Sequence, residues 1–345
     1  MKNVVVALVA SALFIAGCGG KSVLPTVNPA VPGSGINGNT NRVLAALTVT
    51  EVPVPQPSSG PTGITTGPDG NIWFTEYYDN SIATYNISTG KIKRFHLSEV
   101  NARPAGIVTG PDGNLWFTES LADKIGRITT AGVITEFPLA VSGSDPIGII
   151  SGPVGKLWFT ELDNNKIAAI STQTGKIREF TIPTLHSHPA FLAQSADGRA
   201  IWFTENTSGK IGVFNSRGFQ EFTLAAGANP EGIVLGPDGN MWFTDDALSE
   251  VGNITPAGVV TTFPTLTGGA VPSRITVGPS DMGPAALWFT EMGANNIGEV
   301  TTGGVVSEFP IPTAASAVTG ITLGPSNIIY FTEHTANQLG LVSGI

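Results

Sequence analysis

The stretch Gly110–Glu119 reads GPDGNLWFTE, and its last four letters decide the fold. This aromatic–Phe–Thr–acid tetrad occurs seven times, at intervals of 43, 42, 44, 40, 46 and 42 residues. The copies are Trp73–Glu76, Trp116–Glu119, Trp158–Glu161, Trp202–Glu205, Trp242–Asp245, Trp288–Glu291 and Tyr330–Glu333. A period in the low forties, with about four short strands per unit, is typical of a β-propeller blade. The sequence therefore predicts an all-β, seven-bladed β-propeller.

Each repeat carries the signals for four short strands separated by turns. In the first repeat, Gly67–Gly70 spells Gly-Pro-Asp-Gly, a tight turn between a β-branched run and the aromatic strand at 71–76. Further turn residues bound a third strand at 82–85 and a fourth at 91–97. The fourth alternates apolar and polar residues, as an exposed outer strand does. We therefore expect blades of four strands, named inner, second, third and outer.

The two ends of the repeat region predict how the ring closes. The last repeat has a third strand at 339–342 and then no outer strand. Residues 48–53 read TVTEVP and resemble the outer strands at 133–138 and 305–310. We expect this N-terminal strand to complete the last blade and remove an open sheet edge, so that the propeller spans residues 47–345. A long β-solenoid would share the period but would not need the exchanged strand.

The N-terminal segment resembles that of a bacterial lipoprotein. Residues 1–17 contain a short apolar run and end in Ile-Ala-Gly before Cys18, which is similar to a lipobox. The resemblance implies cleavage before Cys18 and lipidation of its thiol, with residues 18–46 as a flexible tether. An ordinary signal peptide followed by an incidental cysteine is the alternative. The first interpretation predicts an extracytoplasmic protein anchored to a membrane, the outer membrane in a Gram-negative host.

Charge and motifs exclude several functional classes. The chain has 26 acidic and 17 basic residues, a formal net charge of −9, and no basic run. Nucleic-acid binding depends on a positive footprint, so we expect no nucleic-acid partner. The sequence also contains no phosphate-binding loop, no Cys/His zinc spacing and no Gly-x-Ser-x-Gly elbow.

Antiparallel pairing brings the start of each inner strand and the tetrad acid to one face of the ring, which we call the mouth face. His334 follows the last tetrad acid on this face. The residues expected at the inner-strand starts, the mouth positions, are Thr62, Ala105, Ile147, Ala190, Glu231, Ser273 and Thr319. In one interpretation the acids supply oxygen ligands for Mg²⁺ or Ca²⁺, or act as general acids and bases. In the other, each acid accepts N–H bonds from a neighbouring turn and recurs because the blade recurs.

Blades four and five depart from the repeat on the mouth face. His186 and His188 precede the fourth inner strand, Glu231 is the only acid at a mouth position, and Asp245 replaces the usual Glu. A histidine beside a carboxylate suits a general base or a metal ligand, so these four are the candidate catalytic residues. Polar residues on exposed loops are the alternative interpretation. The candidate ligands for Mg²⁺ or Ca²⁺ are Glu205, Asp245 and Glu291.

The repeat also resembles that of a known family. Gly110–Glu119, followed by KIGRI at Lys124–Ile128, is similar to the repeat of the streptogramin B (virginiamycin B) lyase family, and the similarity extends over residues 47–345. This resemblance implies a seven-bladed propeller. It also implies enzymes that linearise a cyclic depsipeptide by metal-dependent elimination at the ester, using mouth histidines, a nearby Glu and Mg²⁺ bound by a tetrad-type Glu.

The mouth positions depart from that family's catalytic pattern. The family has His at this position in adjacent blades, once within a Glu-x-His segment, whereas the seven mouth positions here contain no His. Asp145 resembles the acid of that segment, but Ile147 stands where its His would be. An elimination needs a base near the abstracted proton.

The sequence therefore predicts a lipid-anchored propeller that binds a small molecule, or an envelope protein or glycan, on its mouth face without the family's histidine pattern. The alternative is a metal-dependent carbon–oxygen lyase with a site relocated to the surroundings of His186, His188, Glu231 and Asp245. A purely structural envelope module is a third possibility, and whether the protein is an enzyme stays open.

Overall fold

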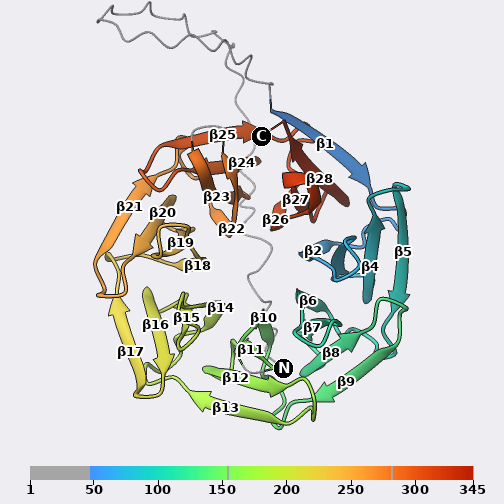
Figure 1. Cartoon of the computed structure of the whole chain (residues 1–345), viewed down its shortest axis with the longest axis horizontal. Helices are drawn as coiled ribbons and strands as arrows, with labels where there is room; N and C mark the ends of the chain where they lie inside the picture. Colours follow the sequence, from blue (N-terminus) through green and yellow to red (C-terminus); the bar gives the residue numbers. More distant parts are fainter. Residues whose placement is uncertain (1–46, 154, 281–282, 345) are drawn as a thin grey trace, which may run out of the picture. The chain divides into compact units, whose positions relative to one another are not determined.

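The computed structural model describes residues 47–153, 155–280 and 283–344, which belong to one compact unit, Ala46–Ile345. The described residues form 28 strands in seven four-stranded antiparallel sheets, with one short 3-10 helix, η1 (Pro325–Asn327). The sheets are arranged as blades around a central channel (Figure 1). The predicted seven-bladed propeller is thus confirmed. None of the described residues form a helix long and apolar enough to cross a membrane.

Within each blade the strands follow one another outward from the channel. The inner strands are β2 (Pro61–Thr66), β6 (Pro104–Thr109), β10 (Pro146–Ser151), β14 (Pro189–Gln194), β18 (Pro230–Leu235), β22 (Pro272–Ser280) and β26 (Val318–Leu323). The second strands are β3 (Ile72–Glu76), β7 (Leu115–Glu119), β11 (Lys156–Glu161), β15 (Ile201–Glu205), β19 (Met241–Asp245), β23 (Gly283–Glu291) and β27 (Ile329–Glu333).

The outer half of each blade is formed by two more strands. The third strands are β4 (Ser81–Asn86), β8 (Lys124–Ile128), β12 (Lys166–Ser171), β16 (Lys210–Asn215), β20 (Glu250–Ile254), β24 (Asn296–Val300) and β28 (Gln338–Ser343). The outer strands are β5 (Lys91–His96), β9 (Ile134–Pro138), β13 (Ile177–Thr181), β17 (Gly218–Thr223), β21 (Val260–Pro264), β25 (Val306–Pro310) and, for the last blade, β1 (Thr48–Pro53).

The ring closes as the sequence predicts. Strand β1 pairs antiparallel with β28, in register from Thr48↔Ser343 to Pro53↔Gln338. Asn337 adds to this closure, because its Nδ2 donates to the carbonyls of Val54 (3.0 Å) and Gln56 (2.7 Å). The exchanged strand is therefore fixed by both backbone and side-chain hydrogen bonds.

The tetrad supplies the apolar contacts between blades. Successive residues of a strand point to opposite faces of the sheet. Trp73 accordingly packs in one cluster with Leu115 and Phe117 of the following blade, whereas Phe74 packs with Tyr330 of the preceding one. The tetrad Trp of each of the first six blades also stacks on a Phe of its own outer strand, with ring centroids 5.3 to 5.8 Å apart. The tetrad thus packs its blade against both neighbouring blades.

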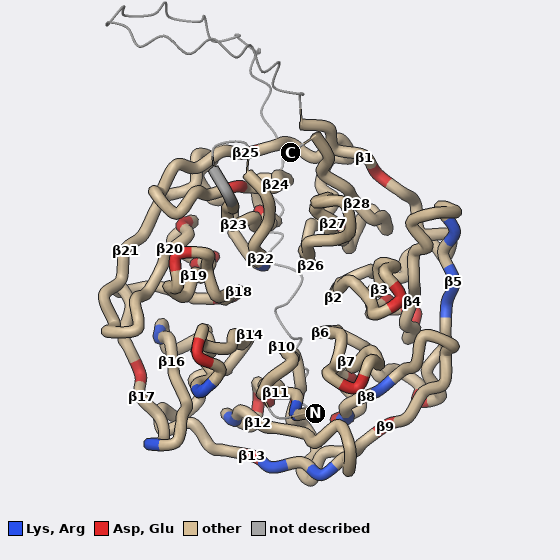
Figure 2. The backbone as a smooth tube through the Cα atoms, in the orientation of Figure 1, with Lys and Arg blue, Asp and Glu red and all other residues tan. Residues whose placement is uncertain are grey.

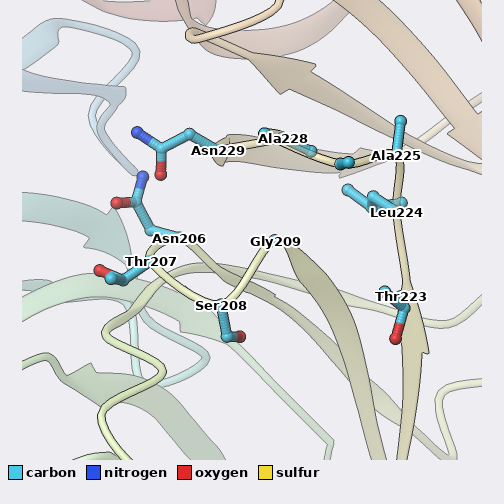
Figure 3. A pocket seen from close by; sticks show the side chains of 11 residues that line it. Asn206, Thr207, Ser208, Gly209, Thr223, Leu224, Ala225, Ala228 and Asn229 are labelled. Atoms are coloured by element: carbon cyan, nitrogen blue, oxygen red, sulfur yellow. The ribbon is translucent and has the colours of Figure 1, made fainter.

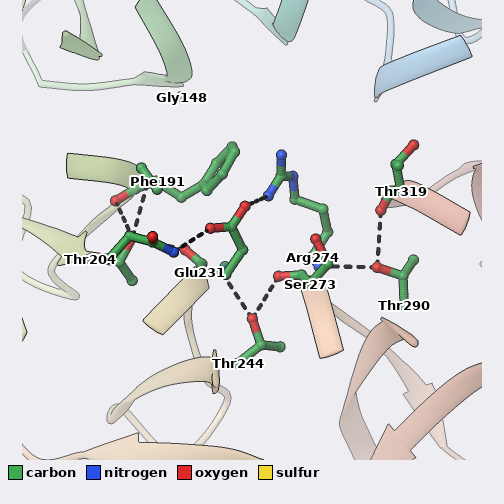
Figure 4. Close-up of polar contacts among 12 residues, drawn as sticks. Gly148, Phe191, Thr204, Glu231, Thr244, Ser273, Arg274, Thr290 and Thr319 are labelled. Atoms are coloured by element: carbon green, nitrogen blue, oxygen red, sulfur yellow. Dashed lines mark hydrogen bonds and ion pairs between the residues drawn. The ribbon is translucent and has the colours of Figure 1, made fainter. Parts of the chain in front are cut away.

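A belt of threonine hydroxyl groups joins the inner strands. Pro61 pairs with the tetrad acid and Ile64 with Phe74, so a bulge between them leaves the Gly63 N–H without a strand partner. This N–H donates to Thr75 Oγ1 at 2.8 Å, and the same hydroxyl donates to the mouth-position carbonyl of the next blade at 2.9 Å. The same pattern recurs with Thr118, Thr160, Thr204, Thr244, Thr290 and Thr332 (Figure 4).

Removing strand β1 tests the closure. We expect deletion of residues 1–55 to lower the thermal midpoint by about 5 °C or more, because the last blade loses a quarter of its sheet and exposes an edge. Deletion of residues 1–46 is the control and should leave the midpoint unchanged. Equal midpoints for the two truncated forms in calorimetry would show that β1 does not stabilise the ring.

Candidate functional site on the mouth face

The seven tetrad acids lie at the ends of the second strands and are buried, with at most 1 % of each residue exposed. Figure 2 shows acidic positions along the second strands, inside the ring, and basic positions on the outer strands β5 and β13. Asp245 Oδ1 accepts backbone N–H groups of Asn229 (3.0 Å) and Leu248 (3.1 Å), and Glu76 is paired with Arg94 Nε at 2.6 Å. Among the seven tetrad acids, Asp245 is therefore the one that accepts backbone N–H bonds from neighbouring loops, as one interpretation of the sequence predicts for all of them.

The remaining acids are poorly paired. Both carboxyl oxygens of Glu119 and Glu333 lack a hydrogen-bond partner among the described residues. Burial raises the pKa of Glu119 and Glu291 to about 8. It raises the pKa of the other three to about 7, namely Glu161, Glu205 and Glu333. At neutral pH the carboxyl groups of Glu119 and Glu291 are therefore mostly protonated, and those of Glu161, Glu205 and Glu333 are protonated for about half of the time.

The candidate metal ligands are distributed over three blades. Glu205, Asp245 and Glu291 end the second strands of blades four, five and six. Within the described ranges, no group of three or more His, Cys, Asp and Glu side chains is arranged to hold a metal ion. Binding of Mg²⁺ or Ca²⁺ by these acids stays a prediction.

The four candidate catalytic residues each have their own surroundings. His186 is exposed, whereas His188 Nδ1 lies 2.7 Å from Thr207 Oγ1. Glu231 accepts a hydrogen bond from Asn206 Nδ2 at 2.9 Å, so the adjacent residues Asn206 and Thr207 connect it to His188. Asp245 makes the backbone bonds described above. Blades four and five are thus connected on the mouth face through Asn206 and Thr207.

A pocket of about 470 Å³ adjoins this connection. It is enclosed by the loop after β15, residues 206–209, and by residues 223–229, which lead from β17 to β18. Asn206 and Asn229 lie at one end and Thr223 and Leu224 at the other (Figure 3). The pocket thus has amide groups at one end and an apolar wall at the other.

A charged and aromatic group faces the channel between blades four and six. Arg274 Nη1 pairs with Glu231 Oε1 at 2.7 Å, and its Cζ lies 3.4 Å from the centre of the Phe191 ring (Figure 4). Burial lowers the pKa of Arg274, and the charge of Glu231 opposes that effect. We call Phe191, Glu231 and Arg274 the mouth platform. It is a fixed ion pair covered by an aromatic ring.

The sequence contains a signal for the platform that our interpretation did not use. Phe191 and Arg274 follow a mouth position directly, and the other five blades have glycine there: Gly63, Gly106, Gly148, Gly232 and Gly320. A Cβ added to Gly63 would lie 2.1 Å from the carbonyl oxygen of Ala105. Large side chains at two of these seven tightly packed positions mark a departure from the repeat.

His334 lies across the channel mouth in a second group. Its Nδ1 is 3.0 Å from Thr62 Oγ1, and the Thr62 hydroxyl donates to the carbonyl of Gly60 at 3.0 Å. Nδ1 therefore carries the proton, and Nε2 keeps a lone pair that has no partner among the described residues. Burial lowers the pKa of His334 to about 4, so the imidazole is neutral at pH 7.

Two tyrosines and an arginine surround this histidine. The ring centroid of Tyr78 lies 5.0 Å from that of His334, and Arg103 Cζ lies 4.8 Å from the Tyr78 ring and 4.9 Å from the Tyr77 ring. Burial raises the pKa of Tyr77, and the charge of Asp145 adds to this. We call Tyr77, Tyr78, Arg103 and His334 the aromatic cluster. It requires contacts between blades that are distant in sequence.

Asp145 is buried beside this cluster. Only 4 % of the residue is exposed, and neither carboxyl oxygen has a hydrogen-bond partner among the described residues. Burial raises its pKa to about 7, and the charges of Asp163 and Asp123 contribute. Its backbone is left-handed, with φ of 47°, and this conformation belongs to the repeat, because it recurs at the equivalent positions Gly60, Arg103, His188, Val271 and Ala317.

The protonated acids predict a pH dependence of stability. A carboxyl whose pKa rises from 4.5 to about 8 on folding, as for Glu119, takes up a proton when the chain folds. The free energy of unfolding therefore falls as pH rises through that window. Glu119→Gln should reduce the loss of stability between pH 5 and pH 8 by at least about 1 kcal/mol, since one pKa unit corresponds to about 1.4 kcal/mol.

Denaturant unfolding at both pH values measures this difference. Glu76→Gln is the matched control, because it removes the carboxylate paired with Arg94 and should destabilise the protein at both pH values. An unchanged pH dependence in the Glu119→Gln variant would show that this carboxyl does not hold its proton in the folded state.

Known proteins provide an independent comparison. The model of the virginiamycin B lyase family matches residues 47–224 and 199–344. Virginiamycin B lyase from Staphylococcus aureus is similar with a TM-score of 0.80 and 36% identity, over 86% of this chain and 99% of that one. An inactive histidine-to-alanine variant of that enzyme with quinupristin gives a TM-score of 0.81 at 36% identity, with coverages of 86% and 99%.

A further solved structure, described as a streptogramin B lyase, has a TM-score of 0.80 and 34% identity, over 86% of this chain and 97% of that one. Among curated proteins, no match was found. The family model and these structures cover nearly all of the described ring. This chain therefore belongs to the virginiamycin B lyase family.

Proposed function

We propose that this protein binds a cyclic peptide or a ligand of similar kind on its mouth face, and that it does not catalyse the elimination that its family resemblance implies. The observation that carries the proposal is the mouth platform. Where a base would be needed, the mouth positions carry no imidazole, and Glu231, the acid among them, is engaged with Arg274 at 2.7 Å.

The chemistry of the platform suits binding better than proton transfer. Both carboxylate oxygens of Glu231 already accept hydrogen bonds, Oε1 from Arg274 at 2.7 Å and Oε2 from Asn206 at 2.9 Å, so neither is positioned to take a proton from a substrate. The exposed edges of Phe191 and Arg274 offer an aromatic surface and hydrogen-bond donors, which are the groups that peptide carbonyls and aromatic side chains contact. The relative with quinupristin supports a ligand of this size.

The aromatic cluster favours a second candidate, a carbon–oxygen lyase with a relocated base. Neutral His334 has an unpaired Nε2 on the mouth face, close to Tyr78 and Arg103. In such an elimination a base takes a C–H proton, a C=C bond forms, and the C–O bond breaks to release a carboxylate. With a pKa of about 4, His334 is available in the neutral form but is a weak base.

Incubation with quinupristin separates the two candidates. We expect residues 46–345 to leave the ester ring intact, with or without Mg²⁺, because loss of a positioned base typically costs roughly two to four orders of magnitude in rate. Mass spectrometry detects ring opening. Rapid opening that disappears in His334→Ala or His188→Ala would identify a relocated base and overturn the non-enzymatic proposal.

Calorimetric titration tests binding by the platform. We expect saturable binding of quinupristin, weakened at least tenfold in the Phe191→Gly and Arg274→Gly variants. Both variants restore the residue that five other blades carry at this position, so the ring should still fold. His96→Ala, on an outer strand, is the control and should bind normally. Equal affinities in all four proteins would exclude the platform as the binding site.

We also propose that lipidated Cys18 anchors the protein to a bacterial membrane, outside the cytoplasm. The support is the sequence alone, because Cys18 lies outside the described residues. We expect Cys18→Ser to move the protein from the detergent-requiring membrane fraction to a soluble or unprocessed form, since stable anchoring takes more than one lipid chain. Processed Ser variant that remains with the membrane fraction would contradict the anchor.

A further inference from the structure

The face opposite the mouth carries a cavity between blades three and four. Its walls include the turns from inner to second strand and from third to outer strand, which lie at the strand ends away from the mouth. The cavity has a volume of about 350 Å³. Its lining includes Trp158, Arg178, Phe180, Arg199, Phe214 and Asn215. A cavity of this size accommodates a small organic molecule.

The indole N–H of Trp158 is a buried donor without an acceptor. In blades one, two and five, the tetrad Trp donates Nε1–H to the Asp of its Gly-Pro-Asp-Gly turn, at 3.0 Å in each case. In blade six, Trp288 donates to the carbonyl of Pro279 at 2.8 Å. Trp158 is 8 % exposed, and its Nε1 has no partner among the described residues.

The sequence explains why the Trp158 indole N–H lacks an acceptor. The third repeat reads Gly-Pro-Val-Gly, so Val154 stands where the turns of blades one, two, four and five have Asp. Val154 lies outside the described residues, and its aliphatic side chain carries no acceptor. Leaving a buried donor unpaired is costly, so an acceptor supplied by a ligand would be favourable.

Aromatic rings form one wall of the cavity. Trp158 stacks on Phe180 with ring centroids 5.5 Å apart and an interplanar angle of 21°. The ring of Phe214 lies 5.8 Å from Trp158 and 4.5 Å from Phe180. Three adjacent rings offer a surface on which a planar apolar group packs well.

Two guanidinium groups bring positive charge to the same cavity. Arg178 Cζ lies 4.8 Å from the centre of the Phe180 ring, and Arg199 lines the cavity from blade four. Both residues are exposed, and neither forms an ion pair with another described residue. In a chain with a net charge of −9, two cations at one cavity favour an anionic ligand, although the charge of Arg199 also acts on the neighbouring Asp197 carboxylate.

We propose that this cavity binds a small aromatic carboxylate, at a site separate from the mouth face. The carboxylate accepts the Trp158 Nε1–H and faces Arg178 and Arg199, whose planar forks match carboxylate geometry. The aromatic ring of the ligand packs against Phe180 and Phe214. A neutral sugar could pack on the aromatic rings but would have no negative charge to pair with Arg178 and Arg199.

Indole nitrogen resonances provide a direct test. In residues 46–345 labelled with ¹⁵N-tryptophan, the chain's six Trp give six indole N–H signals, and Trp158→Phe assigns the one of interest. The probes are indole-3-acetate and benzoate, with benzamide as the uncharged counterpart of benzoate. We expect each carboxylate to shift the Trp158 signal saturably and to leave the other five in place, and benzamide to bind at least tenfold more weakly than benzoate.

Three variants separate the contributions. Val154→Asp supplies the acceptor found in other blades and should weaken binding at least tenfold, as should Arg178→Gln. Arg217→Gln removes the same charge from the turn between β16 and β17, outside the cavity lining, and should bind normally. The five other indole signals report whether each variant is folded. If the Val154→Asp variant does not fold, the affinity of the Arg178→Gln variant tests the proposal.

Three results would overturn the proposal. The first is the absence of a saturable Trp158 shift with either carboxylate up to about 10 mM, well above the range expected for a specific site. The second is unchanged affinity in the folded Val154→Asp and Arg178→Gln variants. The third is equal affinity for benzamide and benzoate, which would show that the site does not recognise the carboxylate.

Discussion

The hydrogen bonds of the tetrad threonines hold the blades in a ring. Each hydroxyl, such as that of Thr75, accepts the N–H freed by a bulge in its own inner strand and donates to a carbonyl of the next blade. Thr332 completes the circuit by donating to the carbonyl of Thr62 at 2.7 Å. The bulge frees the Gly63 N–H for the threonine hydroxyl, and the absence of a side chain at Gly63 leaves room for the Ala105 carbonyl that the same hydroxyl contacts. The threonine of the tetrad is therefore a joint between blades.

The mouth platform and the unpaired Trp158 indole both lie where the sequence of one blade differs from that of the others. Phe191 and Arg274 replace glycines, yet their backbone N–H groups keep the threonine bonds at 3.0 Å. The belt therefore tolerates new side chains on its channel side. On the opposite face, one altered turn in blade three leaves a tryptophan donor free without disturbing the strand pairing of β10 and β11. Side chains at these positions can thus differ between blades while the threonine hydrogen bonds and the strand pairing stay the same.

The sequence predicted the fold well because the fold is local and repeated. Turn residues and strand alternation are visible within one period of the chain, and the exchanged strand at 48–53 is visible when the two ends of the repeat region are compared. The site was harder, since the aromatic cluster brings Tyr78 and Arg103 together with His334 from the last blade. The carboxyl environments also depend on burial, so identical tetrads give a paired Glu76 and an unpaired Glu119. Glu231 at a mouth position, His334 after the last tetrad and the two glycine replacements were readable in the sequence, whereas their contacts were not.

The exchanged strand has a consequence for the timing of folding. Asn337 donates to the carbonyl of Val54, a residue 283 positions earlier in the chain. Contacts this distant form late, because the entropy of closing so long a loop must be overcome before they contribute. Six blades can form their sheets from consecutive strands, but the seventh needs β1 and β28 from opposite ends of the ring region. The ring is thus closed last, and until then the folding chain presents an unpaired sheet edge at each end.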